Sequence, residues 1–269
     1  MKLNSILESK QPKRWLTEMS EIVAYIEKAR LDVTSDYRIN KDGTVDFFGH
    51  VLFDMAIFED LYKDPRFPHF PNTIPIKFGT VDGNFNVNHL RLKTLEGCPT
   101  KVTGLFKASY NIFPDLKGGP KRVGKDYYAS NNLELKSLEG MAETVGGGVN
   151  LSSTGISEED FKYLPKKMSE LQLAHCENVK TLSGLNNFVE KIEKSIAILG
   201  IDLTGGLLGL LKIKGLKFGI QHGAGSLSEK PLSKAINIVD SYMPVKTNDA
   251  IMDCQNELID AGLEEYARV

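Results

Sequence analysis

Cysteine, long apolar runs and a surplus of either charge are all scarce in this sequence. Only three of the 269 residues are cysteines, at Cys98, Cys176 and Cys254. None of them belongs to a CxxC pair, so the sequence indicates neither a disulfide framework nor a zinc knuckle. We therefore expect a protein of a reducing cytoplasm, without a bound metal.

Signals for a membrane are also missing. The first fifteen residues lack the apolar segment of a signal peptide. The most apolar window, residues 196–216, is interrupted by Asp202, by two lysines and by five glycines. Such a window does not predict a membrane span, and we expect no contact with a membrane.

The overall charge is close to neutral, at −2 for pH 7. A chain with this balance lacks the global basic field that nucleic-acid binders usually carry. Hydrophobic residues make up 41% of the chain and charged residues 25%, which excludes a mostly disordered protein.

Patterns of catalytic residues are weak. The glycines at 146–148 are not followed by the Lys-Ser/Thr of a phosphate loop, and the histidines show no metal-ligand spacing. His175 and Cys176 form the most suggestive pair for nucleophilic catalysis, but adjacent strand residues point to opposite faces. We expect no enzyme and no cofactor. An enzyme that uses the repeats as a scaffold, with Cys176 as nucleophile, is kept as an alternative.

What the sequence does contain is a repeat. LKTLEG at 92–97 recurs as LKSLEG at 135–140, and five longer segments align around these hexapeptides. The segments read FNVNHL, FKASYN, YYASNN, VNLSST and LQLAHC, and they begin at residues 85, 106, 127, 149 and 171. Spacings of 21 and 22 residues are typical of a solenoid of short stacked units.

Each segment alternates apolar and polar residues, as a strand with one buried face does. Positions one and three are apolar or small, as in Phe85 and Val87, whereas positions two and four are mostly polar. Position six is asparagine only at Asn111 and Asn132, so a continuous asparagine ladder is not predicted. We expect an α+β, β-rich fold, a short-repeat solenoid of 21–22-residue units with helical caps at both ends.

The LxLxxN/C pattern with further leucines resembles a short form of the leucine-rich repeat. The phrases LEGCPTKV (95–102) and LKGGPKRV (116–123) are similar to a degenerate repeat family of tailed bacteriophages of the large myovirus type. The ending CQNELIDAGLEEYARV also looks like the end of such phage proteins. The resemblance covers about residues 74–216. It implies a phage protein that acts in the cytoplasm of the host bacterium.

The repeat divides the chain into three regions: an N-terminal cap at 1–73, repeat units at 74–220 and a helical C-terminal cap at 221–269. Within these regions we expect a helix at 15–29, a β-hairpin at 38–51, a proline-rich loop at 60–73, closing strands at 209–220, a loop at 222–231, and helices at about 232–242 and 249–266.

Outward strand positions form a polar ladder across the units, and a rigid surface of this kind is typical of recognition. We expect a non-enzymatic protein–protein interaction scaffold that binds a host protein, and the phage resemblance points to a component of a bacterial defence system. The predicted partner-binding residues are Asn84, Asn86, Asn88, Lys107, Ser109, Asp126, Tyr128, Ser130, Asn150 and Gln172.

A basic segment offers a second reading. Residues 117–128 place four basic side chains beside two tyrosines, a combination that suits single-stranded nucleic acid. The four are Lys117, Lys121, Arg122 and Lys125. A structural role in the virion is a further alternative, and the sequence fixes neither the partner nor the oligomeric state.

Overall fold

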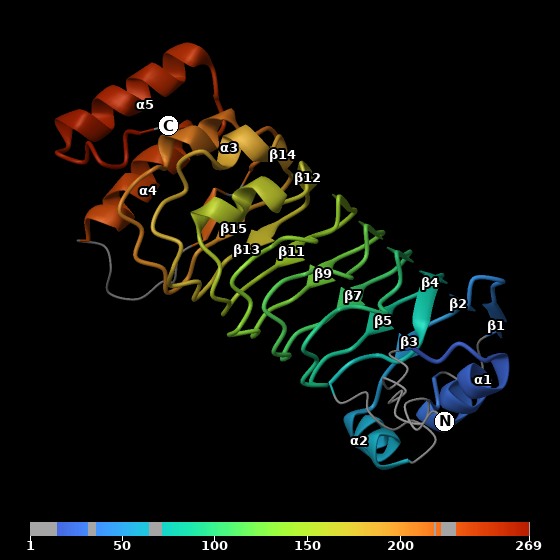
Figure 1. Ribbon diagram of the computed structural model, residues 1–269. Helices are drawn as coiled ribbons and strands as arrows, with labels where there is room; N and C mark the ends of the chain where they lie inside the picture. The colour runs from blue at the N-terminus through green and yellow to red at the C-terminus, as the bar shows by residue number, and fades with distance from the viewer. Residues whose placement is uncertain (1–14, 32–35, 65–71, 218, 222–229, 269) are drawn as a thin grey trace, which may run out of the picture.

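The computed structural model describes residues 15–31, 36–64, 72–217, 219–221 and 230–268 (Figure 1). Its fold is α+β, with several sheets of parallel strands and a few helices, so the expected class is confirmed at this level. The strand order within each sheet is linear. The units follow one another along an elongated molecule with helices at both ends.

Five of the eight strands in the larger sheet come from the segments that the sequence repeat marks. All its strands are two residues long, and they pair in parallel in the order β16-β15-β13-β11-β9-β7-β5-β3. Position one pairs with position one, as Phe85 does with Phe106 and Phe106 with Tyr127. The strands are β3 (Val51–Leu52), β5 (Phe85–Asn86), β7 (Phe106–Lys107), β9 (Tyr127–Tyr128), β11 (Val149–Asn150), β13 (Leu171–Gln172), β15 (Ile196–Ala197) and β16 (Ile220–Gln221).

The strand segments all turn at position five of the unit. The backbone there has φ between 57° and 62°, the left-handed region that non-glycine residues enter at a cost. Hydrogen bonds between units offset this cost, as when the Tyr110 N–H donates to the Ser130 carbonyl at 3.1 Å. The residues with this conformation are His89, Tyr110, Asn131, Ser153 and His175.

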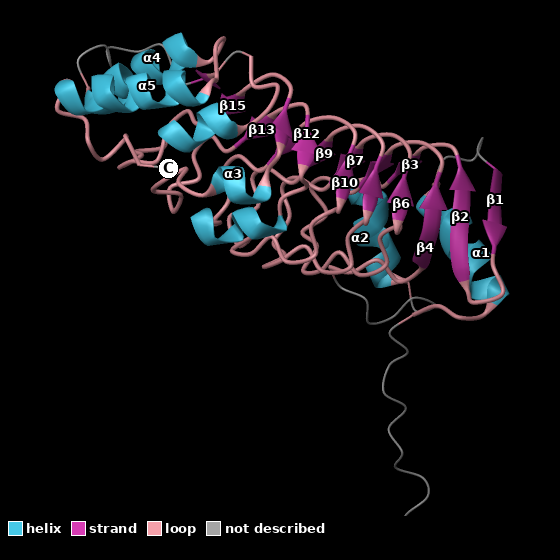
Figure 2. Cartoon of the chain, turned by 90° about the horizontal axis from the view of Figure 1, so that it is seen from above, coloured by secondary structure: helices cyan, strands magenta, loops and turns pink. Residues whose placement is uncertain are grey.

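A second sheet, which the sequence did not predict, takes one strand from each of several units (Figure 2). Its first two strands form the expected antiparallel hairpin, and the others pair in parallel. The strands are β1 (Asp36–Ile39), β2 (Thr44–Phe48), β4 (Lys77–Val81), β6 (Lys101–Val102), β8 (Arg122–Val123) and β10 (Thr144–Val145). The next two units supply β12 (Lys167–Met168) and β14 (Lys191–Ile192), which pair with each other.

The N-terminal region differs from the prediction in two places. The helix expected at 15–29 begins later, as α1 (Met19–Ala29). Part of the proline-rich loop expected at 60–73 is instead the end of α2 (Met55–Lys63). Phe58 and Leu61, three residues apart, bury one face of α2, and the Asp54 carboxylate caps its first turn. Residues 65–71 of that expected loop lie outside the described residues.

The C-terminal region keeps its two helices, as α4 (Pro231–Tyr242) and α5 (Asn248–Asp260). The second ends six residues before the expected boundary, because Gly262 turns the chain with φ of 70°. The prediction of closing strands at 209–220 is wrong for most of that range. Its first residues belong to the 3₁₀ helix η2 (Leu208–Lys212), and of its described residues only the last belongs to a strand, β16. Residues 222–229 of the expected loop lie outside the described residues.

Two further short helices lie within the units, η1 (Glu158–Tyr163) and α3 (Leu185–Phe188). These two helices pack against each other, and α3 also packs against η2. In the part of the chain that the structure describes, no helix is long and apolar enough to cross a membrane.

The core contains a buried polar column at position six. The Asn132 side-chain oxygen accepts the Asn111 N–H at 2.5 Å, and its amide donates to the carbonyls of Ala108 and Ala129 at 3.0 and 2.7 Å. In the next unit Thr154 takes this place, with its hydroxyl donating to the Leu151 carbonyl at 2.7 Å. Asparagine thus forms only part of the column, and a hydroxyl and then the Cys176 thiol continue it.

Candidate functional site

Five of the predicted partner-binding residues form one row across the larger sheet. They are the second residues of adjacent strands, so the parallel register places each beside the next. All five are partly exposed, because odd positions point into the core and even positions away from it. The row consists of Asn86, Lys107, Tyr128, Asn150 and Gln172.

The asparagines at the start of this surface also hold units together. The Asn84 side-chain oxygen accepts the Leu105 N–H at 2.8 Å, and that of Asn88 accepts the Ser109 N–H at 2.8 Å. Each bond uses the side-chain oxygen of the asparagine and fixes the orientation of its amide group. Asn84 and Asn88 therefore contribute to the rigidity of the surface, and each retains an amide nitrogen for a partner.

Two predicted surface residues are buried, and the expectation that they face outward is wrong. Ser109 and Ser130 are 5% and 8% exposed, and their hydroxyls lie 3.0 Å apart in a hydrogen bond between units. Both occupy position four, directly before the left-handed turn at position five. A side chain there packs between stacked units, where a small hydroxyl finds a partner in the neighbouring unit.

The middle of the row is hollowed. A polar cavity of about 110 Å³ is lined by Asp126, Tyr128, Asn150 and Gln172 from the predicted set, together with Glu170 and Lys194. This volume suits the end of one polar side chain or a few waters. The structure therefore brings four predicted residues together at one place.

Hydrogen bonds fix the acidic side chains of this hollow. The Asp126 carboxylate accepts the Gly148 N–H at 2.7 Å and the Tyr128 hydroxyl at 3.1 Å. The Gln172 amide donates to the Glu170 carboxylate at 3.0 Å. Burial raises the pKa of Tyr128, and the hydrogen bond to Asp126 and the charges of Asp126 and Glu170 act in the same direction. The phenol thus stays neutral and donates a hydrogen bond to a carboxylate.

Glu170 is a hollow residue that the sequence analysis missed. It precedes position one of its unit, in the same place as Asn84 and Asp126 in theirs. That column of the repeat was the available signal. With Asp126 and Glu170 on one side and Lys194 on the other, the hollow carries an excess of one negative charge. Such an acceptor-rich site suits the cationic end of a lysine or arginine side chain.

The predicted basic segment is divided by the structure. Lys117 is paired with Glu139 at 2.7 Å and lies 3.7 Å from Asp115, which raises the pKa of Lys117. Lys117 is therefore ion-paired at the surface, and the basic patch stays a prediction. Lys121, Arg122 and Lys125 are exposed.

Arg122 belongs instead to a basic row that begins on the second sheet. It pairs in register with Lys101 on one side and with Thr144 on the other. Later units carry Lys167 and Lys191 on the separate pair β12 and β14, and Lys191 bridges to Lys214. Adjacent strands lie about 4.8 Å apart, and Thr144 interrupts the cations between Arg122 and Lys167. Lys191 is paired with Glu193 at 2.6 Å. The other four form no ion pair with any described residue.

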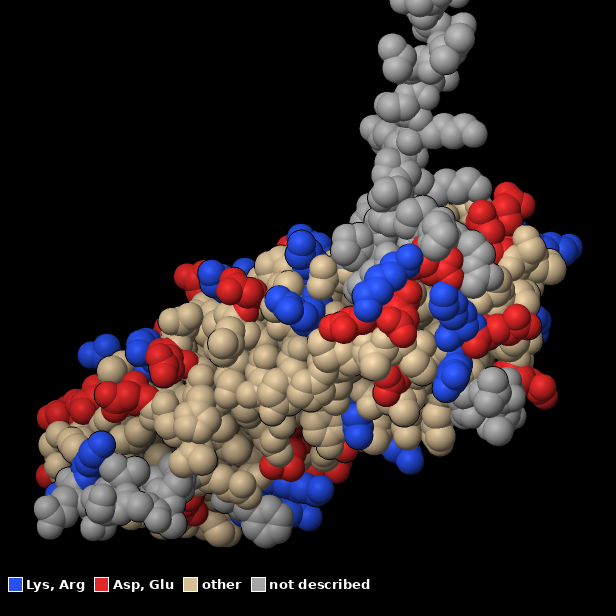
Figure 3. Space-filling view, turned by 90° about the horizontal axis from the view of Figure 1, so that it is seen from below, with Lys and Arg blue, Asp and Glu red and all other residues tan. Residues whose placement is uncertain are grey.

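Exposed apolar side chains follow the strand face in two units. Tyr110 is half exposed and stacks on His89 with ring centroids 4.2 Å apart, and Ile112 and Leu133 occupy one repeat position in adjacent units. Seen from below, the molecule has a broad band without charged side chains between charged margins (Figure 3).

The candidate nucleophile is buried. Cys176 is fully buried and its thiol donates to the Leu151 carbonyl at 3.1 Å, whereas His175 is exposed. Burial raises the pKa of the Cys176 thiol, which disfavours the reactive thiolate. Among the described residues, no group of three or more His, Cys, Asp or Glu side chains could hold a metal ion.

Comparisons of the chain with family models, with curated proteins and with solved structures gave no match.

Proposed function

We propose that this chain is a leucine-rich-repeat-like solenoid that acts as a non-enzymatic protein-binding scaffold. Two observations support the solenoid. Position one pairs with position one across successive units, and backbone hydrogen bonds connect residues 20 to 25 apart along the chain. Stacked units of this kind share one core and present a rigid outer surface.

The observation that carries the binding function is the polar hollow around Tyr128. Its side chains are fixed by hydrogen bonds before any partner arrives, so binding costs little conformational entropy. A partly exposed tyrosine beside two carboxylates is a composition that suits a binding hot spot. The partner that fits is a protein that inserts a lysine or arginine side chain into the hollow.

The source of the partner rests on the resemblance to phage repeat proteins. We propose a phage protein in the cytoplasm of an infected bacterium and a host protein as its target, for which a defence component is the natural candidate. The repeat phrases at 95–102 and 116–123 are what support this part of the proposal.

The test compares two pairs of substitutions on different sheets. Tagged protein captures partners from a nuclease-treated bacterial lysate, and the binding of each captured protein is then measured with purified components. The pair Tyr128→Ala and Glu170→Ala is expected to weaken the binding of a genuine partner at least tenfold. The pair Lys101→Ala and Arg122→Ala serves as the control and leaves binding unchanged. If both double variants bound the partner equally well, the hollow would be excluded as the binding site.

The basic row favours a second function, the binding of a nucleic acid. The row holds four cations that form no ion pair with a described residue, namely Lys101, Arg122, Lys167 and Lys214, and the first two are direct neighbours in register. Because no aromatic side chain belongs to this row, recognition would use phosphates and would not depend on sequence.

Salt dependence tests this second function. If four cations displace counterions from single-stranded DNA, the logarithm of the binding constant falls with the logarithm of salt concentration with a slope of about −3. The Lys101→Ala, Arg122→Ala pair should make that slope shallower by about 1.4. The Tyr128→Ala, Glu170→Ala pair should not change it. Failure to bind single-stranded DNA at low salt would exclude this function.

A further inference from the structure

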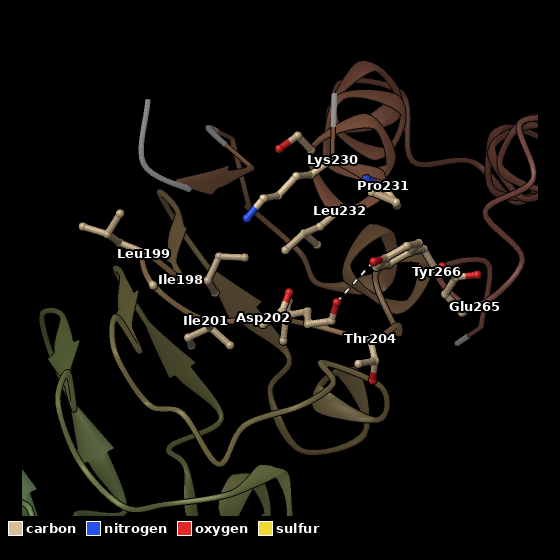
Figure 4. Close-up of a pocket in the computed structure, with 13 residues that line it drawn as sticks. Ile198, Leu199, Ile201, Asp202, Thr204, Lys230, Pro231, Leu232, Glu265 and Tyr266 are labelled. Atoms are coloured by element: carbon tan, nitrogen blue, oxygen red, sulfur yellow. Dashed lines mark hydrogen bonds between the residues drawn. The ribbon is translucent and has the colours of Figure 1, made fainter. Parts of the chain in front are cut away.

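A second, larger cavity lies at the other end of the molecule, where the C-terminal region meets the last units (Figure 4). Its volume is about 420 Å³, within the range of pockets that hold small molecules and near its lower end. One wall comes from residues 198–204, which follow β15. The other comes from residues 230–233 at the start of α4 and from residues 265–266.

Most of the wall is apolar and fixed. Ile198, Leu203 and Tyr266 are at most 5% exposed, and Leu232 closes the cavity from the side of α4. The Tyr266 hydroxyl donates to the Leu203 carbonyl at 3.2 Å, which joins the C-terminal segment to the unit below it. The ring is therefore held in place, and it offers a flat apolar surface to a ligand.

Two opposite charges enter this apolar cavity. The Lys230 side chain reaches into the opening from the start of α4, and the Asp202 side chain points into it from the opposite wall (Figure 4). Glu265 also lines the cavity, but its side chain points away. Within the described part of the chain, neither Lys230 nor Asp202 has an ion-pair partner. They are also too far apart to pair with each other.

A buried polar group adds to the positive side. Ser233 lines the cavity and is only 4% exposed. Its hydroxyl makes no hydrogen bond with any described residue, so it can donate to a ligand. The N-terminal turn of α4, which holds Ser233, carries a partial positive charge. An anionic oxygen placed there would meet the Lys230 ammonium and a free hydroxyl.

We propose that this cavity binds a free α-amino acid with a large apolar side chain. The ligand carboxylate lies against Lys230 and Ser233, and its ammonium pairs with Asp202. Its side chain fills the space between Leu232, Ile198 and the Tyr266 ring. A zwitterion satisfies both charges at once, whereas a purely apolar ligand would leave each of them desolvated and unpaired. This binding is independent of the function proposed for the strand face.

The experiment uses the whole protein and three probes that share one apolar body. The probes are L-phenylalanine, 3-phenylpropanoate without the ammonium, and 2-phenylethylamine without the carboxylate. Binding is measured by calorimetry and by ligand-observed NMR. L-phenylalanine is expected to bind at least tenfold more tightly than either single-charge probe, because each hydrogen-bonded charge contributes about a factor of ten or more.

Variants assign the two charges. Asp202→Asn should weaken the binding of L-phenylalanine and of 2-phenylethylamine about tenfold and leave the binding of 3-phenylpropanoate unchanged. Lys230→Gln should weaken the binding of L-phenylalanine and of 3-phenylpropanoate about tenfold and leave the binding of 2-phenylethylamine unchanged. Lys234→Gln and Asp253→Asn remove the same charges from exposed positions that do not line the cavity, and they should change nothing. Equal binding of all three probes, or no binding of L-phenylalanine at 10 mM (about the weakest affinity of interest), would overturn the proposal.

Discussion

The units that begin at residues 85, 106 and 127 differ from those that begin at 149 and 171. The early units have rings at position one, with centroids of Phe85 and Phe106 6.0 Å apart and those of Phe106 and Tyr127 4.9 Å apart. The later units place Val149 and Leu171 at the same position of the same sheet. One column of the core thus changes from stacked rings to branched aliphatic side chains, while the backbone register stays the same.

The unit length changes together with the core. Position-one residues lie 21 residues apart in the early units, and the register between Leu171 and Ile196 spans 25. The strands and the left-handed turn stay the same, so the extra residues are accommodated elsewhere in the unit. They form η1, α3 and η2, which pack on one another. The comparison teaches that the strand side is fixed by hydrogen bonding, whereas the opposite side tolerates insertion.

The largest test of this comparison removes one ring from the aromatic column. Phe106→Ala is expected to lower the free energy of unfolding by about 3–5 kcal/mol, because the ring is fully buried between two others. Leu171→Ala at the same repeat position should cost less, about 2–4 kcal/mol. Urea denaturation of both variants measures the difference. A larger loss at Leu171 would show that the aliphatic half carries more of the core.

The next test concerns the buried polar column. Asn132→Ala removes one acceptor and two donor bonds and leaves the Asn111 N–H unpaired. We expect a loss of about 3 kcal/mol. Thr154→Ala removes the bond to the Leu151 carbonyl and a weaker one with the Cys176 thiol, and we expect about 1 kcal/mol. Equal losses in thermal unfolding would mean that the asparagines are no more important than the hydroxyl that follows them.

The comparison also explains what the sequence could predict. Alternation at the start of each segment, repeated five times, predicted the register of the larger sheet, because positions one and three carry apolar or small side chains that are buried. The second sheet was missed because most of its strands in the units are short and lie outside the alternating segments. Helix α2 was missed because the prolines that follow it suggested a loop.

The candidate site was predictable only where it lies on regular strands. Tyr128, Asn150 and Gln172 follow from alternation alone, but the burial of Ser109 and Ser130 depends on the left-handed turn that follows them. The sequence carried a partial signal for that turn, because His89, Asn131 and His175 are of types enriched in the left-handed region, whereas Tyr110 and Ser153 are not. The C-terminal cavity depends on how residues 265–266 pack against 203–204, a long-range contact that no local pattern contains.

Tyr127 stands at the boundary between the two halves, and its hydroxyl provides a smaller test. The side chain is fully buried, and within the described residues its hydroxyl has no hydrogen-bond partner. Phe85 and Phe106 occupy the same position without a hydroxyl. Tyr127→Phe is therefore expected to stabilise the protein by about 1–2 kcal/mol. Tyr266→Phe, which loses the bond to Leu203, should destabilise it by about 1 kcal/mol. A stability loss in Tyr127→Phe would reveal a partner for that hydroxyl.

The smallest effect is the pH dependence that this same hydroxyl creates. Burial raises the pKa of Tyr127, and the neighbouring Cys98 acts in the same direction. The folded-state pKa thus lies above the unfolded value of about 10, so the neutral phenol's contribution is fully present below pH 10 and is lost as the pH rises toward the folded-state pKa. By pH 11 this loss amounts to about 1 kcal/mol. Tyr127→Phe has no such group, so its advantage over the unmodified protein should grow by that amount between pH 9 and pH 11 in urea denaturation. A constant advantage across this range would mean that the phenol ionises equally in both states, and the position would then be open to water and not part of the aromatic column.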